Sequence, residues 1–136
     1  MPYLLDTDSA SLAFQGNERV RSRILEATGV WLSSITAEER IRGVLNTIQK
    51  TRDMPPFSRA QAFLIELLAD ISSYDLHPYN DEAARVYASF PASVKRVGPQ
   101  DCRIAASAIA AGWIVVTANR RHFSQIPGVQ FEDWSR

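Results

Sequence analysis

The sequence has a single cysteine, Cys102, and only two histidines among its 136 residues. One thiol cannot form an internal disulfide, and this composition excludes a metal site built mainly from cysteine. No apolar run approaches the roughly 20 residues that a membrane-spanning helix needs. The first residues lack a basic segment and reach a carboxylate at Asp6, so we expect no signal peptide and a cytoplasmic protein.

An excess of charge of either sign is also missing, because 15 basic residues balance 15 acidic ones. A protein that binds nucleic acid through its overall positive charge is therefore excluded, although a local basic patch is not. Lysine is scarce, and 13 of the 15 basic residues are arginine. The planar guanidinium suits paired contacts to phosphate or carboxylate, but a preference set by genome composition would give the same bias.

The chain is 46% hydrophobic and 22% charged, and no repeat or linker divides it, so we predict one domain over residues 1–136. Short apolar runs predict strands at residues 3–5, 30–32, 74–77, 113–117 and 129–131. Helical spacing of apolar residues predicts helices at residues 17–27, 37–51, 58–71, 80–90 and 100–111. Residues 91–99, bounded by prolines, are predicted to form a mobile loop.

Strands with continuous apolar runs alternate here with helices, which is typical of a parallel sheet covered on both faces. We therefore predict an α/β fold with three layers, α/β/α, around a central parallel β-sheet. Ligands of such folds bind outside the carboxyl ends of the strands. In this sequence those ends are residues 6–9, 33–36 and 117–119.

Acidic residues gather at these strand ends and at the starts of the neighbouring helices. They are Asp6, Asp8, Glu38, Glu39 and Asp101, and Asn119 follows the last long strand. Carboxylates crowded at one sheet edge repel one another, and a divalent cation is the natural counter-charge. Oxygen ligands without thiolates favour a hard ion, so we predict a site for Mg²⁺ or Mn²⁺.

Each acidic residue also has a purely structural interpretation. Thr36 and Glu39 match a capping box, in which the glutamate only satisfies the start of a helix. Asp8 could be an ordinary N-cap, and the first turn of any helix favours an acidic residue such as Asp101. Asp6 is harder to explain in this way, because a carboxylate that closes an apolar strand is costly unless something binds it.

Four segments resemble, in the same order, the motifs of PIN-domain ribonucleases. They are Leu-Leu-Asp-Thr-Asp at 4–8, Ser-Ser-Ile-Thr-Ala-Glu-Glu at 33–39, Gly-Pro-Gln-Asp-Cys-Arg-Ile-Ala-Ala-Ser-Ala at 98–108 and Val-Thr-Ala-Asn-Arg-Arg-His-Phe at 116–123. The tail Phe-Glu-Asp-Trp at 131–134 is similar to the end of many toxin-type members. Each motif is weak alone, but four in order over almost the full length resemble a VapC-type toxin of a bacterial toxin–antitoxin pair.

The resemblance implies a role for four residues, one on each motif. Asp6 and Asp101 match the metal-binding aspartates of the family, and Glu39, rather than Glu38, matches its acidic position by spacing from the threonine of the motif. Asn119 stands where the family has Asp or Asn. The predicted catalytic set is therefore Asp6, Glu39, Asp101 and Asn119.

His122 departs from the family pattern, because toxin-type members often have an acidic residue just before the matched phenylalanine. An imidazole there reduces the negative charge of the site and could weaken a second metal ion, or contact phosphate instead. Outside the resemblance, His122 is interpreted as an exposed turn residue. Cys102, which has no His or Asn partner at matching spacing, is expected to be a small buried residue rather than a nucleophile.

The implied function is a Mg²⁺-dependent endoribonuclease that hydrolyses phosphodiester bonds in RNA, with Arg120 and Arg121 placed to bind flanking phosphates. Toxin-type relatives bind an antitoxin protein and are commonly homodimers, so both partners are expected here. The sequence supports an apolar contact surface only through its aromatic residues, which exceed what one small core must bury: Trp31, Phe57, Phe63, Tyr87, Trp113 and Trp134.

Two alternatives remain open on the sequence alone. The Asp6-Thr-Asp8 segment after an apolar strand also resembles the start of haloacid-dehalogenase-like phosphatases, although Lys95 lacks the acidic pair that such a site needs. The second alternative is a catalytically degenerate PIN scaffold that acts through protein contacts, and His122 is the residue that favours it.

Overall fold

The computed structural model describes residues 2–136. Its strands are β1 (Tyr3–Leu5), β2 (Val30–Ser33), β3 (Asp75–His77), β4 (Ile114–Val116) and β5 (Phe131–Glu132). Its helices are α1 (Thr7–Phe14), α2 (Glu18–Glu26), α3 (Ser34–Thr51), α4 (Phe57–Ser72), α5 (Asp81–Ser89), α6 (Ala92–Val97), α7 (Pro99–Ala111) and α8 (Arg120–Phe123). Within residues 2–136, no helix has the length and apolar character needed to cross a membrane.

The strands form one parallel sheet in the order β3-β2-β1-β4-β5. The chain begins at the central strand β1, moves outward to β3 and then returns to add β4 and β5 on the other side of β1. The direction of winding therefore reverses between β1 and β4, and this is the place where open α/β sheets bind their ligands. Asp6 directly follows β1, and Thr117 directly follows β4.

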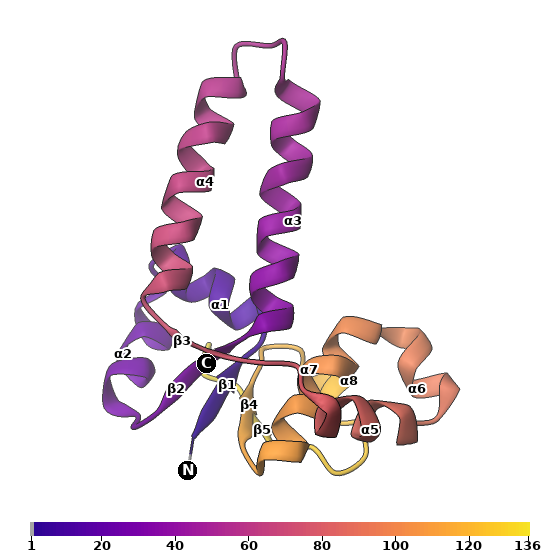
Figure 1. Ribbon diagram of the computed structural model, residues 1–136. Coiled ribbons are helices and arrows are strands. Elements are labelled where there is room, and N and C mark those ends of the chain that lie inside the picture. Colours follow the sequence, from indigo (N-terminus) through magenta and orange to yellow (C-terminus); the bar gives the residue numbers. More distant parts are fainter. Residues whose placement is uncertain (1) are drawn as a thin grey trace.

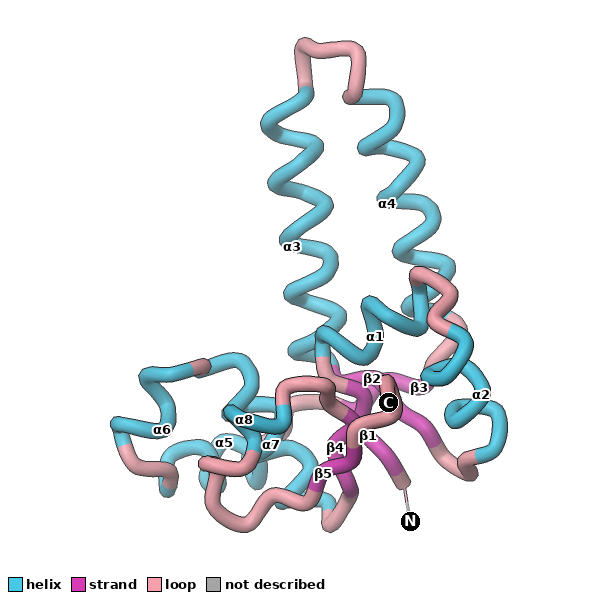
Figure 2. Tube along the Cα trace, turned by 180° about the vertical axis from the view of Figure 1, so that it is seen from behind, coloured by secondary structure: helices cyan, strands magenta, loops and turns pink. Residues whose placement is uncertain are grey.

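Helices cover both faces of the sheet, as Figures 1 and 2 show. Neighbouring residues of β1 point to opposite faces, so Leu4 belongs to one apolar core and Leu5 to the other. The core around Leu4 is built mainly from α7, with residues such as Ile104, and the core around Leu5 includes residues of α1 to α4. This arrangement confirms the predicted α/β fold with a central parallel sheet.

Helices α3 and α4 pack against each other as a hairpin that projects away from the sheet (Figure 1). With 18 residues and a rise of about 1.5 Å per residue, α3 is about 27 Å long, so only its first turns can reach the sheet. The hairpin exposes large apolar side chains, at Leu45, Met54, Phe63, Ile65 and Leu68. Of the aromatic residues predicted to exceed the core, Phe63 is 48% exposed, whereas Trp134 is buried.

Two helices, α1 and α6, were not predicted, because their first turns carry signals that hydrophobic periodicity does not show. Asp6 is the N-cap of α1, a helix that the periodicity did not reveal, and its Oδ1 accepts a hydrogen bond from the Ser9 backbone N–H at 2.8 Å. Residues 92–97, predicted as a mobile loop, form α6, whose first turn closes through the backbone N–H groups of Val94 and Lys95 onto the Pro91 carbonyl. A proline at the start of a helix sacrifices no helical hydrogen bond. Pro91 is therefore the N-cap of α6 and does not mark the start of a loop.

The predicted start of α3 at residue 37 was wrong, and α4 begins one residue before its predicted start. Helix α3 begins at Ser34, with Ser33 as its N-cap, so Thr36 lies within the first turn as a fully buried residue and forms no capping box with Glu39. Helix α4 begins at Phe57 without a side-chain cap, and the hydroxyl of Ser58 donates to the Pro55 carbonyl at 3.5 Å.

Candidate active site

Asp6 stands at the carboxyl end of the central strand and is almost completely buried, with 1% of its surface exposed. Burial raises the pKa of its carboxyl group to about 6, although hydrogen bonds from the Thr117 side chain and the Ser9 backbone act in the opposite direction. Among residues 2–136, no Lys, Arg or His forms an ion pair with Asp6. Within residues 2–136, the buried carboxylate at this strand end is therefore hydrogen-bonded but has no cationic side chain as a partner.

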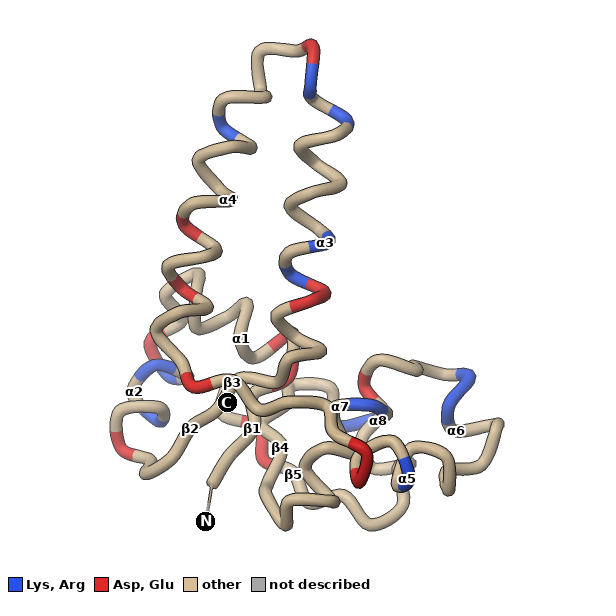
Figure 3. The backbone as a smooth tube through the Cα atoms, viewed as in Figure 1, with Lys and Arg blue, Asp and Glu red and all other residues tan. Residues whose placement is uncertain are grey.

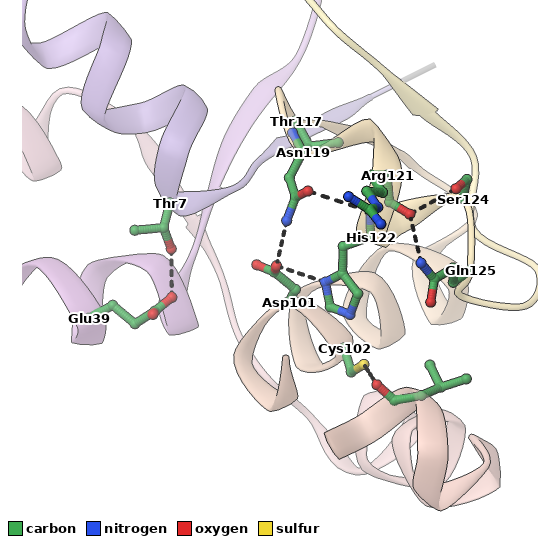
Figure 4. Close-up of polar contacts among 11 residues, drawn as sticks. Thr7, Glu39, Asp101, Cys102, Thr117, Asn119, Arg121, His122, Ser124 and Gln125 are labelled. Carbon is green, nitrogen blue, oxygen red and sulfur yellow. Dashed lines mark hydrogen bonds and ion pairs between the residues drawn. The ribbon is translucent and has the colours of Figure 1, made fainter. Parts of the chain in front are cut away.

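Glu39 reaches this edge from the second turn of α3. Its Oε1 accepts a hydrogen bond of 2.6 Å from the hydroxyl of Thr7, the residue after Asp6 (Figure 4). The Thr7 hydroxyl also lies 3.3 Å from that of Thr36. Glu38 is different, because it forms an exposed ion pair with Arg42 one turn along the helix. Of the two glutamates, Glu39 contacts the residue that follows Asp6 and Glu38 does not.

Asp101, Asn119 and His122 form the second polar group, shown in Figure 4. The Nδ1 atom of His122 lies 2.9 Å from Oδ2 of Asp101, and the Asn119 side-chain amide donates to the same oxygen at 3.4 Å. Asn119 is also the N-cap of α8, where its Oδ1 accepts from the His122 backbone N–H at 3.4 Å. Contrary to the interpretation as an exposed turn residue, His122 is 6% exposed.

A hollow of about 420 Å³ opens beside Asp101 and is lined by Val97, Asp101, Asn119, Arg121, His122 and Gln125. A second hollow, of about 310 Å³, begins at Thr7 and Glu39 and continues along the hairpin to Ala60 and Phe63. The two arginines predicted to bind phosphate lie in different places. Arg121 lines the hollow beside Asp101, whereas Arg120 lies beside Glu132 and Asp133.

Sequence reasoning missed Thr7, which contacts Glu39. The signal that could have found it is its position, since a hydroxyl residue directly after a strand-ending aspartate lies at the same sheet edge. Cys102 is a small buried residue as expected, whereas the interpretation of Asp8 as an N-cap was wrong. Cys102 is buried with its thiol directed at the Val94 carbonyl, and burial raises the pKa of that thiol. Asp8 is exposed on α1 and is not its N-cap.

The donor set suits a hard divalent cation. The carboxylates of Asp6 and Asp101 supply oxygen atoms, and the Asp6 carboxylate, which forms no ion pair within residues 2–136, is the group that such an ion would neutralise. Within residues 2–136, no three His, Cys, Asp or Glu side chains are spaced to surround one ion. Mg²⁺ characteristically keeps several waters and binds through one or two carboxylates, so it fits a pair of aspartates better than a closed protein cage.

Comparison with known proteins gives consistent results at the levels of sequence and fold. The family of PIN domains matches residues 3–129. The tRNA(fMet)-specific endonuclease VapC of Salmonella typhimurium is 31% identical, with 98% of each chain covered, and that of Shigella flexneri is 28% identical, with 99% of each covered.

Among solved structures, the DNA-bound VapBC complex of Salmonella typhimurium has a chain with a TM-score of 0.76 and 30% identity, covering 98% of each chain. The DNA-bound VapBC2 complex of Rickettsia felis gives 0.78 at 21% identity, with 98% of this chain and 99% of the other covered, which supports the fold alone. With its parallel sheet, its acidic strand ends and these relatives, the chain belongs to the PIN domain family and, within it, to the VapC-type proteins.

Proposed function

We propose that this protein is a Mg²⁺-dependent endoribonuclease and the toxin of a toxin–antitoxin pair. The observation that carries the proposal is the buried carboxylate of Asp6 at the switch point of the sheet, which forms no ion pair within residues 2–136, with Asp101 and Glu39 supplied from α7 and α3. Structured RNA is the proposed substrate, because the VapC relatives are named as tRNA(fMet)-specific endonucleases. Initiator tRNA is therefore the first substrate to test.

Asp6 and Asp101 would hold the ion, which when bound polarises a phosphodiester and lowers the pKa of a water molecule. Glu39, fixed by the Thr7 hydroxyl, would accept the proton of the water that attacks phosphorus while the P–O bond on the opposite side breaks, and the departing oxygen would take a proton from solvent. Asn119 donates to Asp101 and so limits the rotation of that carboxylate. Arg121, which lines the hollow beside Asp101, would bind a flanking phosphate.

The test is cleavage of purified initiator tRNA by the purified protein, with and without Mg²⁺. We expect discrete cleavage products that disappear with EDTA and return when excess Mg²⁺ is added. Asp101→Asn, which preserves shape but removes the charge, should be inactive in the same preparation. Cleavage that is equal in the wild type and the Asp101→Asn variant would place the activity elsewhere, and absence of cleavage of any RNA would favour the catalytically degenerate scaffold.

We also propose that an antitoxin protein covers the hairpin. The hollow that starts at the Glu39 carboxylate ends against Phe63. A third hollow, also lined by Phe63, continues along the hairpin to Leu67 and Phe14. A helix with an apolar face and a basic residue at one end would fill both and neutralise Glu39. Co-expression with the product of the neighbouring open reading frame should yield a stable complex in which cleavage is suppressed.

Self-association is proposed as well, because large apolar side chains of the hairpin, among them Leu45, Ile65 and Leu68, are exposed. Light scattering at tens of micromolar protein should give the mass of a homodimer. A strictly monomeric mass in the absence of antitoxin would contradict this part of the proposal.

A further inference from the structure

The carboxylate of Asp101 receives both of its hydrogen bonds on one oxygen. His122 Nδ1, at 2.9 Å, and the Asn119 side-chain amide, at 3.4 Å, both contact Oδ2. No hydrogen bond among residues 2–136 ends on Oδ1, and in Figure 4 this second oxygen turns away from both donors, toward the side of the view that carries Thr7 and Glu39. One oxygen is thus anchored while the other is presented to the site.

The ring of His122 is itself fixed by its surroundings. A Cβ atom built on Gly98 would lie 2.5 Å from Cε1 of this ring, closer than real Cβ atoms approach other atoms, and a tight 3.1 Å from Nδ1. The φ angle of Gly98 is −166°, which is extended backbone that any residue adopts. Glycine is therefore needed at this position for space and not for its backbone conformation.

Gly98 also connects the ring to the helix that carries Asp101. It directly precedes Pro99, the first residue of α7, and Asp101 lies in the first turn of that helix. The backbone that leads into α7 therefore packs against the same ring that contacts Asp101. A side chain at position 98 would displace that ring.

The contact also determines which nitrogen of His122 carries a proton. An ionised carboxylate only accepts hydrogen bonds, so Nδ1 must donate to Asp101. Nε2 is buried and has no partner among residues 2–136, and an unprotonated nitrogen is less costly there than an unsatisfied N–H group. A ring with its proton on Nδ1 satisfies both conditions.

We propose that His122, held in place by Gly98, is a positioning residue for Asp101. It donates to Oδ2 and so leaves Oδ1 free for the ion that Asp101 would hold. The inference rests on the proposed function, because it assigns Asp101 to the metal. Loss of the donor lets the carboxylate rotate, and loss of such a supporting hydrogen bond typically weakens metal affinity by about 10- to 100-fold.

The first experiment reads the tautomer of His122 in the metal-free wild-type protein by long-range ¹H–¹⁵N NMR. The chain has only two histidines, so the His77→Asn variant assigns both rings. We expect the proton on Nδ1 of His122. A proton on Nε2 alone would overturn the proposal, and this result does not depend on whether any His122 variant folds.

The second experiment measures the affinity for Mn²⁺ alone by calorimetry. His122→Leu removes the donor and should raise the Kd by about 10-fold or more. His122→Asn keeps an N–H donor near the position of Nδ1 and should restore most of the affinity. Gly98→Ala leaves both polar residues in the chain but displaces the ring, so it should weaken binding as His122→Leu does.

His77→Leu is the matched control, because His77 is also buried but packs against Trp113 on the β3 side of the sheet. Its Kd for Mn²⁺ should equal that of the wild type. An unchanged Kd in a folded His122→Leu protein would refute the positioning role. If the wild type itself binds no Mn²⁺ and cleaves no RNA, the proposed function fails instead, and the NMR result still decides the geometry of His122.

Discussion

The helical hairpin and the acidic sheet edge meet at Glu39 but are built in opposite ways. The hairpin is two consecutive helices, α3 and α4, whose apolar side chains remain partly exposed. The sheet edge combines side chains from distant parts of the sequence, and Asp6 there is buried. Figure 3 shows acidic residues near the strand ends and, in the hairpin, charged residues at the tip and none over residues 43–49 of α3 or 60–65 of α4.

This difference indicates a division of tasks. Exposed apolar surface is unfavourable in water, and binding of another protein would bury it. A buried carboxylate is unfavourable because it lacks a counter-charge, and binding of a cation would neutralise it. A substitution in one region should therefore leave the task of the other intact, and single variants in each region can test this independence.

The largest effect is expected for Asp6→Asn. The amide keeps an oxygen that can accept from the Ser9 backbone N–H, so the cap of α1 survives while the charge is lost. Loss of a residue that only supports a metal ligand typically lowers metal affinity or activity by about 10- to 100-fold. Loss of a ligand itself should therefore reduce tRNA cleavage by at least about 100-fold. Binding of the antitoxin to the hairpin should be retained, and its loss in a folded variant would contradict the independence of the two regions.

The second prediction concerns stability and pH in the metal-free protein. The pKa of Asp6 is raised from 3.8 to about 6 in the folded state, so its contribution to stability is fully present below pH 3.8 and is lost as the pH rises through about 6. The difference between these two pKa values corresponds to a change in the free energy of unfolding of roughly 3 kcal/mol at most. Asp6→Asn should therefore be more stable than the wild type at pH 8, and the advantage should shrink toward pH 4.

Urea unfolding at both pH values, with EDTA present, measures this difference. Asp8→Asn is the matched control, because Asp8 is exposed and lies two residues away. A stability difference between Asp6→Asn and the wild type that is independent of pH would show that burial of the charge is not the cause.

A third, smaller effect is expected on the hairpin. Phe63 lines both hollows along α3 and α4, and Phe63→Ala removes the apolar group that the antitoxin would cover. Burial of a large apolar side chain contributes about 1.5 to 3 kcal/mol, so the Kd for the antitoxin should rise by about 10-fold or more. RNA cleavage by the free protein should not change. Leu25→Ala, at an 87% exposed position on α2, should change neither.

The two regions were predictable from the sequence to different degrees. Both hairpin helices were predicted, because their apolar residues recur at helical spacing, but periodicity does not reveal that the pair projects from the sheet. An acidic edge is expected from a topological rule, since the carboxyl ends of parallel strands share one edge, but among residues 2–136 no three carboxylates there are spaced to surround one ion. The family resemblance then selected Glu39 from its neighbour Glu38.

The contacts around the acidic residues were not predictable in the same way. Thr7 and His122 reach their carboxylate partners across 32 and 21 residues of sequence, and no periodicity connects such pairs. His122 was interpreted as a turn residue because the four-residue helix α8 that buries it is too short to give a pattern. The separation of Arg120 from Arg121 follows from the same helix, which directs consecutive side chains to different sides.

The smallest predicted effect uses this pair of arginines. Arg121 lines the hollow beside Asp101, so Arg121→Gln should weaken binding of tRNA a few-fold and lower the slope of log affinity against log salt by about one. Arg120 lies beside Glu132 and Asp133, so Arg120→Gln should leave the slope unchanged. Filter binding to the Asp6→Asn protein between low and moderate salt measures both slopes without cleavage. Equal slopes for the two variants would mean that RNA does not enter through the Asp101 hollow, and the phosphate contacts would have to be sought on the hairpin side of Glu39.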